Sequence, residues 1–400
     1  MASPANSGYV PFFIVAAVAL TLLISSAAAH RYNVLRYGAR PDGITDSTRP
    51  FLMAWAAACS SANAATVYVP NGTYLLMAAV FEGPCWSKIT VRLDGTLVAP
   101  SDYRALGSYE HWILFMSVNK LRFHGGTVDG QAARFWDCRM SGRDCPSGAR
   151  SVTFYWVNDV RVIGLTSIDS QMAHIVINGC NDVLMRNVTA IAPKWSLNTD
   201  GIHIQGSTRV TISGATLETG DDCISIGPGT RDTFMTNINC GPGHGIRYVS
   251  AYHCWNMIED GVKNVTLTNS VFSGSENGVR IKTWARSTTS FVKMVIFENL
   301  IMENVMNPII IDQNYCPYYE GCPNQNSGVR ISGVTYRNVT GESATRDAVV
   351  FDCSKSYPCR GIRLQGINLT YQSMVASSFC NNVVDGTTSG VVTPKCCFCF

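Results

Sequence analysis

Short runs rich in Val, Ile and Thr recur along the chain after about residue 150, separated by clusters of Gly, Asn, Asp and Ser. Such runs are typical of β-strands. Six of these runs begin alike and are separated by 23, 27, 55, 64 and 33 residues. We count the two longest separations as two coils each. A unit this small cannot bury its own apolar face, so neighbouring units must stack. We therefore predict an all-β solenoid, a parallel β-helix. The six runs are Val160-Arg-Val162, Val183-Leu-Met185, Val210-Thr-Ile212, Val265-Thr-Leu267, Val329-Arg-Ile331 and Ile362-Arg-Leu364.

A second repeat places a polar residue and a spacer before alternating apolar residues, with the polar residues 22, 22, 33 and 30 positions apart. If the repeats are equivalent coils, their polar residues form a column at about 4.8 Å per coil, the spacing of neighbouring strands. Arg280 and Lys282 are two apart in one predicted strand, so their side chains project together. The repeats are Asp200-Gly-Ile202-His-Ile204, Asp222-Cys-Ile224-Ser-Ile226, His244-Gly-Ile246-Arg-Tyr248, Asn277-Gly-Val279-Arg-Ile281 and Asn307-Pro-Ile309-Ile-Ile311.

The N-terminal region differs from the repeats. An apolar run over 12–24, followed by small residues up to Ala29, predicts a secretory signal peptide over 1–29. The run is shorter than the ~20 residues of a membrane span. We expect one domain over 30–400, without a membrane anchor after cleavage. Helical spacing of apolar residues from Asp46 to Ala64 predicts an amphipathic helix that caps the solenoid.

Sixteen cysteines favour an extracellular protein with disulfides. Cys353 and Cys359 form one of three close pairs, with Cys138/Cys145 and Cys316/Cys322. Zinc is the rival explanation for Cys396, Cys397 and Cys399, but no paired Cys-x-x-Cys knuckles or His partners accompany them, so we expect no metal. Secretion would make five glycosylation sequons relevant, of which three read Asn-Val-Thr and also fit a repeat signature. The sequons begin at Asn71, Asn187, Asn264, Asn338 and Asn368.

Three acidic residues carry the predicted chemistry. Asp221 and Asp222 follow Gly220, and Asp200 lies one predicted coil below. Hydrolysis of a glycosidic bond needs a carboxylic acid to protonate the leaving oxygen and a carboxylate to activate water or attack. Crowded carboxylates cannot all stay ionised cheaply, so we expect a raised pKa on one of them. Acidic pairs in turns also act as caps or calcium ligands, which is the competing interpretation.

The motifs Asn198-Thr199-Asp200, Gly220-Asp221-Asp222, Gly243-His244-Gly245 and Arg280-Ile281-Lys282, in this order and spacing, resemble the signature of polygalacturonases, glycoside hydrolase family 28. Further matches extend over most of the chain and resemble the plant branch. The resemblance implies a right-handed parallel β-helix that hydrolyses α-1,4 bonds between galacturonate residues with inversion, without a cofactor. The further matches are Asn33–Leu35, Tyr37–Ala39, Gly125–Gly130, Asn307–Cys316 and Phe351–Cys353.

The resemblance also implies roles. Asp221 would be the general acid, Asp200 and Asp222 would hold and deprotonate water, and His244 would tune the acid. Arg280 and Lys282 would bind a substrate carboxylate, a task that suits a guanidinium and an ammonium. An aromatic near the cleavage site would be Tyr315, and His203 is a weaker candidate for a sugar subsite. Cys223 and Cys240 would form a disulfide that braces the acid pair.

The expected partner is pectin or homogalacturonan, an acidic polysaccharide. A protein with a net charge of +3 is compatible with such a partner. Proteinaceous inhibitors are further candidate partners, and we expect a monomer. No Lys/Arg run points to nucleic acid. Carboxyls one coil apart lie nearer than the roughly 6.5–9.5 Å usual for inverting enzymes, so spacing alone would suggest retention.

One stretch departs from the family pattern. After Gly245 the family continues with small residues, whereas this chain has Arg247, Tyr252 and Trp255. Bulky side chains there would narrow the groove, shift specificity or obstruct substrate, and aromatic rings could instead add a sugar subsite by stacking. We expect weaker turnover than in relatives. The alternatives are a β-helix that binds pectin without cutting it, a hydrolase of rhamnogalacturonan, and a calcium-dependent pectate lyase.

Overall fold

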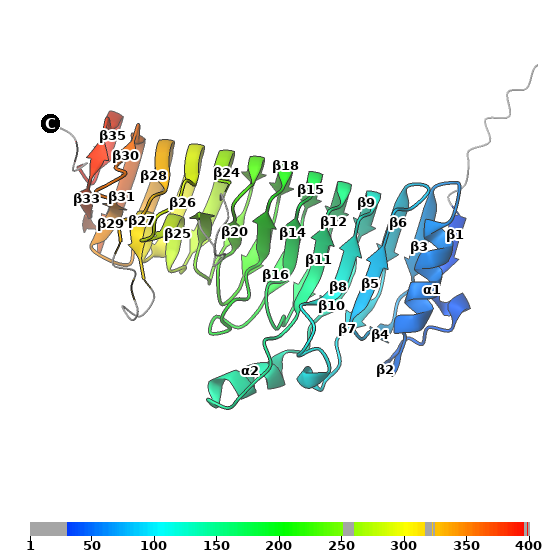
Figure 1. Ribbon diagram of the computed structural model, residues 1–400. Helices are drawn as coiled ribbons and strands as arrows, with labels where there is room; N and C mark the ends of the chain where they lie inside the picture. The colour runs from blue at the N-terminus through cyan, green and yellow to red at the C-terminus, as the bar shows by residue number, and fades with distance from the viewer. Residues whose placement is uncertain (1–29, 251–259, 317–321, 323–324, 396–397, 399–400) are drawn as a thin grey trace, which may run out of the picture.

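The computed structural model describes residues 30–250, 260–316, 322, 325–395 and 398. The predicted signal peptide and Cys396, Cys397 and Cys399 lie outside these residues. Successive coils of β-strands stack along one axis, from the N-terminal coils at one end to the C-terminal coils at the other (Figure 1). The chain is a parallel β-helix, as the repeats predicted.

One wall of the β-helix is an 11-stranded sheet in which each strand pairs in parallel with the strand of the next coil. This sheet carries the candidate site. Its strands are β5 (Ala79–Glu82), β8 (His111–Met116), β11 (Arg150–Tyr155), β14 (Ile175–Asn178), β17 (Ile202–Gln205), β20 (Ile224–Ile226), β23 (Ile246–Ser250), β25 (Asn277–Trp284), β27 (Asn307–Tyr315), β29 (Asp347–Asp352) and β33 (Ser377–Asn381).

The remaining walls form a 24-stranded sheet, to which most coils contribute two strands that merge into one in the later coils. Its pairings are parallel except between β31 and β32. The strands are β1 (His30–Asn33), β2 (Asp42–Asp46), β3 (Ala65–Val69), β4 (Thr73–Leu75), β6 (Ile89–Leu93), β7 (Thr96–Val98), β9 (Asn119–His124), β10 (Thr127–Asp129), β12 (Asn158–Ile163), β13 (Thr166–Ile168), β15 (Asn181–Arg186), β16 (Thr189–Ile191), β18 (Thr208–Ser213), β19 (Thr216–Glu218), β21 (Arg231–Thr236), β22 (Asn239–Cys240), β24 (Val262–Ser273), β26 (Phe291–Val305), β28 (Arg330–Ser343), β30 (Cys359–Arg360), β31 (Arg363–Tyr371), β32 (Met374–Val375), β34 (Val383–Val384) and β35 (Thr387–Thr393).

The second repeat is confirmed residue by residue. Ile202 pairs with Ile224, which pairs with Ile246, and the column continues through Val279 and Ile309. All five side chains are fully buried. Since alternate residues of a strand point to opposite faces, the residue after each of them faces outward. The apolar column therefore fixes the position of every outward side chain in the site.

The first repeat is correct except at one coil. Val160, Val183 and Val210 share a column, which reaches Val265 through one intervening coil. The column then passes through Val334 and not through Val329, the predicted member. Val329 lies just before β28 and reproduces the Val-x-apolar start of the other runs, but the residue in register with Val295 is Val334, inside that strand.

The Asn-Val-Thr sequons coincide with left-handed backbone conformations. Asn187, Asn264 and Asn338 have φ values of 51°, 55° and 50°. Asn tolerates this conformation better than most residues because its short side chain bonds locally. These asparagines therefore have a structural reason for recurring, whatever their glycosylation.

Two helices accompany the strands. Helix α1 (Thr48–Cys59) lies beside the first coils and buries Phe51 and Trp55 against the core (Figure 1). It is shorter than the predicted 46–64, because Asp46 ends strand β2 and accepts hydrogen bonds from Thr48. Helix α2 (Ala133–Met140) belongs to a long excursion from the coils. Within the described residues, neither helix nor any other is long and apolar enough to cross a membrane.

Disulfides link the three predicted close pairs and also Cys223 to Cys240. A further disulfide joins Cys59 at the end of α1 to Cys85, a pairing that the sequence did not indicate. It anchors the helix to the second turn of the solenoid.

Candidate active site

The candidate site lies where Asp200, Asp221 and Asp222 precede strands β17 and β20 of the 11-stranded sheet. All three acids are largely buried, with 8, 9 and 2% of their surface exposed. Asp222 and Asp200 lie on adjacent coils, because Gly201 N donates to the Asp222 carbonyl at 2.9 Å. The predicted column thus brings the three carboxyls together.

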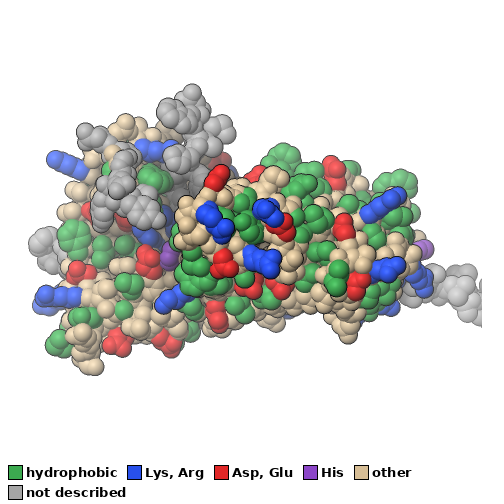
Figure 2. All heavy atoms as spheres, turned by 90° about the horizontal axis from the view of Figure 1, so that it is seen from below, with side chains coloured by type: hydrophobic (Ala, Val, Ile, Leu, Met, Phe, Trp, Pro, Cys, Tyr) green, Lys and Arg blue, Asp and Glu red, His purple; other side chains and the backbone are tan. Residues whose placement is uncertain are grey.

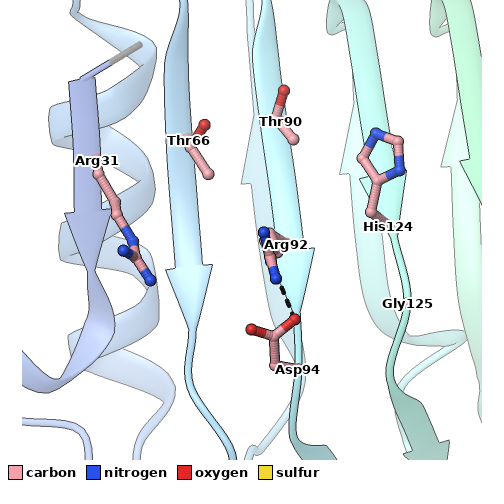
Figure 3. Close-up of a pocket in the computed structure, with 7 residues that line it drawn as sticks. All are labelled: Arg31, Thr66, Thr90, Arg92, Asp94, His124 and Gly125. Atoms are coloured by element: carbon pink, nitrogen blue, oxygen red, sulfur yellow. Dashed lines mark hydrogen bonds and ion pairs between the residues drawn. The ribbon is translucent and has the colours of Figure 1, made fainter. Parts of the chain in front are cut away.

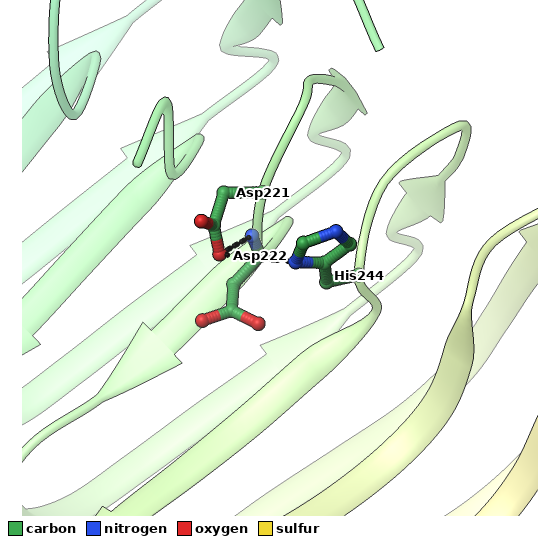
Figure 4. Close-up of side chains that lie close together, drawn as sticks. All are labelled: Asp221, Asp222 and His244. Atoms are coloured by element: carbon green, nitrogen blue, oxygen red, sulfur yellow. Dashed lines mark hydrogen bonds and ion pairs between the residues drawn. The ribbon is translucent and has the colours of Figure 1, made fainter. Parts of the chain in front are cut away.

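Asp221 is held by backbone donors and by His244. Its Oδ2 accepts a hydrogen bond from Asn198 N at 2.9 Å, and its Oδ1 accepts one from Asp222 N at 2.8 Å. The Nδ1 atom of His244 lies 3.3 Å from the same Oδ1. Figure 4 shows the imidazole of His244 beside both acids. Both carboxylate oxygens of Asp221 therefore have partners that hold the side chain in place.

The Gly-His-Gly turn sets the position of His244. Gly245 has φ +84°, and a Cβ on it would lie 2.1 Å from the Asn277 carbonyl oxygen, so only glycine fits. The Nε2 atom of His244 lies 3.3 Å from a carboxylate oxygen of Glu276. Asn277, a member of the predicted column, instead donates to the His244 carbonyl and supports this turn.

A chain of polar contacts runs outward from Asp200. Ser225 Oγ donates to Asp200 Oδ2 at 2.5 Å, and Nδ1 of His203 lies 2.7 Å from that hydroxyl. His203 therefore reaches the acids through Ser225 rather than directly. Burial lowers the pKa of His203, which favours the neutral ring.

Arg247 enters the acid cluster from strand β23. Its Nε lies 2.5 Å from Asp222 Oδ2, and its Nη2 lies 3.9 Å from Asp200 Oδ2. Register places Arg247 in one outward row with His203, Ser225 and Arg280. Of the bulky residues noted in the sequence, Tyr252 and Trp255 lie outside the described residues, and Arg247 forms an ion pair with the acids.

The electrostatics of the acids are unequal. Burial raises the pKa of Asp222 to about 8, with the charges of Asp221 and Asp200 adding to it and Arg247 opposing. Burial would also raise the pKa of Asp221, but the hydrogen bond and charge of His244 outweigh it and lower the value to about 2. The expected raised pKa is therefore present, on Asp222.

Arg280 and Lys282 project together, as predicted, and share Tyr315. The Lys282 Nζ lies 3.7 Å from the centre of the Tyr315 ring, and the Arg280 guanidinium lies 5.2 Å from it. Arg280 also contacts Asp312 at 3.3 Å. Burial lowers the pKa of Lys282 to about 8. This cationic and aromatic surface adjoins the acids.

The Cys223–Cys240 disulfide lies directly behind the acid pair. Cys223 is fully buried; its carbonyl accepts a hydrogen bond from Ile202 N, and its N–H donates to the Gly245 carbonyl, so it is held by both neighbouring coils. Because Cys223 follows Asp222 in the chain, the disulfide restrains the bend that presents both acids.

Sequence reasoning missed Ser225 and Glu276. Ser225 occupied the outward position of the second repeat, so its contact with the site was readable from the register. Glu276 immediately precedes Asn277 of the same repeat, but its contact with His244 depends on the loop between the coils. Neither residue belongs to a motif.

Other features lie apart from this constellation. A surface pocket lined by Arg31, Arg92, His124 and four neighbours lies on strands of the 24-stranded sheet (Figure 3). On the face in Figure 2, Lys and Arg side chains are interspersed with Asp and Glu. Asp221, Asp222 and His244 bring ligand atoms within 4.8 Å of one another, a spacing that would suit a metal ion. The guanidinium of Arg247 on Asp222 supplies positive charge at that point instead.

Comparison with known proteins gives a consistent result. Residues 59–397 match the family model of glycosyl hydrolases family 28. The chain is 50% identical to a polygalacturonase of Prunus persica, over 94% of this chain and 96% of that protein. It is 39% identical to an exopolygalacturonase of Platanus acerifolia, over 91% of this chain and 97% of that protein.

Among solved structures, the endo-xylogalacturonan hydrolase of Aspergillus tubingensis superposes with a TM-score of 0.78 at 21% identity, over 91% of this chain and all of that one. At this identity the likeness concerns the fold, which is the right-handed parallel β-helix. From the family match and the plant relatives it follows that the chain belongs to family 28 of the glycosyl hydrolases.

Proposed function

We propose that this protein hydrolyses the α-1,4 bonds between galacturonate residues of pectin. The observation that carries the proposal is the placement of three buried carboxyls beside Arg280 and Lys282. The acids supply the chemistry of glycoside hydrolysis, and the cations match the carboxylate of the sugar. The Prunus and Platanus relatives, named for activity on polygalacturonate, support this substrate.

In the proposed reaction, one acid protonates the bridging oxygen while a carboxylate takes a proton from water that attacks C1. Resemblance assigns the acid to Asp221 and the water to Asp200 and Asp222. The contacts of Arg247 support the second part, since one side chain reaches both Asp222 and Asp200 at 2.5 and 3.9 Å. A water molecule between these carboxylates would have the same two partners.

The assignment of Asp221 as the acid is opposed by the pKa values of the two carboxyls. His244 lowers the pKa of Asp221, and the raised pKa belongs to Asp222. Because neighbouring carboxyls titrate as a unit, the pair holds the transferable proton jointly. We retain Asp221 as the donor, since it is the more exposed of the two. Inversion is part of the proposal, and the anomer first formed tests it.

The cationic residues favour galacturonate over a neutral sugar at the cleavage point. Arg280 lies 3.3 Å from Asp312 and 3.9 Å from Glu276, so its guanidinium is held in place by two carboxylates beside the acids. A rhamnogalacturonan hydrolase would need to accept a neutral residue there. A lyase would yield an unsaturated product that absorbs ultraviolet light, which hydrolysis does not.

The proposed setting is extracellular, with 1–29 as the signal peptide, 30–400 as the catalytic domain, and a monomer as the active form. The disulfides support an oxidising compartment. Pectin is the proposed partner, and inhibitor proteins would act on the same groove.

The experiment is the release of reducing ends from polygalacturonate by the purified protein at mildly acidic pH. Asp221→Asn is the matched control, because it keeps shape and removes the acid. We expect release by the wild type and its loss in the variant. A folded wild type that binds polygalacturonate without releasing ends would contradict the proposal and favour a binding protein.

A further inference from the structure

We propose that Arg247 is an activity-limiting residue whose guanidinium occupies the place of the hydrolytic water. This inference rests on the proposed function. It concerns a residue outside the motifs assigned to the reaction, and it starts from the position of Arg247 in the solenoid. The parallel register places it between Ser225 and Arg280 in the outward row.

The contacts of Arg247 concern the two acids proposed to hold water. Nε lies 2.5 Å from Asp222 Oδ2, and Nη2 lies 3.9 Å from Asp200 Oδ2. Only 16% of the Arg247 side chain and 3% of the Asp222 side chain are exposed. A water molecule cannot approach Asp222 Oδ2 along the direction that the guanidinium already fills.

The positive charge of Arg247, like its volume, hinders the reaction of Asp222 with water. The guanidinium opposes the protonation of Asp222 that burial favours, and an ionised Asp222 held in this ion pair directs its oxygen to the guanidinium and not to water. Desolvated ion pairs are also costly to open on one side, since the remaining charge is left buried. Asp222 in this arrangement therefore activates water poorly, even when substrate is bound.

The other two cations beside the acids have different contacts. Lys282 lies over Tyr315, and Arg280 contacts Asp312 and Glu276. Substrate carboxylates can reach these two without displacing the Asp222 pair. Binding and turnover should therefore respond separately to changes at position 247, with the effect falling on kcat rather than on KM.

The experiment compares the wild type with Arg247→Ser, Arg247→Lys and the control Arg231→Ser on polygalacturonate. Ser suits the position because Ser225 occupies the same row on the neighbouring coil. Arg247→Lys keeps the positive charge, but an ammonium group cannot contact two carboxylates as the branched guanidinium does. Arg231 is an exposed arginine paired with Asp260, so its replacement removes a surface ion pair of the same type.

We expect Arg247→Ser to raise kcat by roughly tenfold or more with little change in KM. Arg247→Lys should lie between it and the wild type, and Arg231→Ser should match the wild type. Guanidinium chloride at low millimolar concentration, well below denaturing levels, should inhibit Arg247→Ser by refilling the vacated place. Equal sodium chloride should not, which separates refilling from screening.

Two contrary results have different meanings. A kcat that is unchanged or lower in Arg247→Ser and not higher in Arg247→Lys, with wild-type activity still dependent on Asp221, overturns the role of Arg247 and leaves the proposed function intact. Absence of hydrolysis in every variant, with polygalacturonate still bound, overturns the proposed function, and the inference with it.

Discussion

The Nζ atom of Lys282 lies 3.7 Å from the centre of the Tyr315 ring, at the edge of the acid cluster. A cation over an aromatic face is stabilised without a paired anion, so the ammonium stays available to a ligand. Its side chain is nevertheless largely buried, and burial lowers its pKa to about 8. The charge that we assign to substrate binding is therefore sensitive to moderately alkaline pH.

The first prediction follows from that pKa. Lys282 is charged below about pH 8 and neutral above it. KM for polygalacturonate should rise between pH 7 and pH 9, by roughly tenfold for loss of one charged contact. In Lys282→Arg the guanidinium stays charged, so the rise should disappear. A wild-type KM that is flat across this range would contradict the assignment of Lys282 to binding.

The second prediction concerns the ion pair of His244 with Asp221. The folded pKa of His244 is raised by Asp221, so its contribution to stability is present below the unfolded value near 6.5 and is lost as the pH rises through the folded value. The pKa of Asp221 is lowered to about 2, so its contribution is present above the unfolded value near 3.9. The pair stabilises most between roughly pH 4 and 6.5.

His244→Asn should therefore lower Tm by roughly 1–3 °C at pH 5.5, a small value because a third of the imidazole is exposed. The loss should shrink at pH 9. His124→Asn, on the 24-stranded sheet, provides the control. Equal losses at both pH values would show that His244 stabilises by packing and not by charge.

The fold was predictable because a solenoid repeats its signal. Each coil places an apolar residue such as Ile202, Ile224 or Ile246 at the same position. A pattern that recurs in several coils is therefore distinguishable from a chance match in one coil. Prediction failed at Val329, which lies just before strand β28, whereas the residue that pairs with Val295 is Val334 inside that strand.

The site was predictable to the level of backbone position and no further. Register placed Asp200, Asp222 and Arg247 on adjacent coils, but it could not say where a long side chain ends. The contact of Arg247 with Asp222 depends on several torsions and on the charges around it. The inequality of the pKa values of Asp221 and Asp222 likewise depends on which oxygen His244 meets.

A third prediction tests the Gly-His-Gly turn. Gly245→Ala places a Cβ 2.1 Å from the Asn277 carbonyl oxygen at φ +84°, so the turn must move and carry His244 with it. We expect hydrolysis to fall by roughly a hundredfold, since small displacements of catalytic groups have such effects. Gly274→Ala is the control, because Gly274 has φ +59° with no atom within 4 Å of its Cβ. Comparable losses in both variants would indicate that backbone strain alone is responsible.

The last prediction separates the acid from the base. An acid is needed only when the leaving group is poor, whereas the water-activating carboxylate is needed for every substrate. If Asp221 is the donor, Asp221→Asn should lose roughly 10²–10⁴ in kcat on polygalacturonate and far less on a galacturonide with a nitrophenolate leaving group. Asp222→Asn should lose activity on both.

The reversed pattern, with Asp222→Asn rescued by the better leaving group, would assign the proton to Asp222. The raised pKa of Asp222 and the lowered pKa of Asp221 would then describe the working enzyme as well as the free site. Arg247 would in that case stabilise the ionised form of the acid after it has given up its proton, because its positive charge lies 2.5 Å from Asp222 Oδ2. Measuring both substrates with both variants thus decides which carboxyl holds the proton in the reaction.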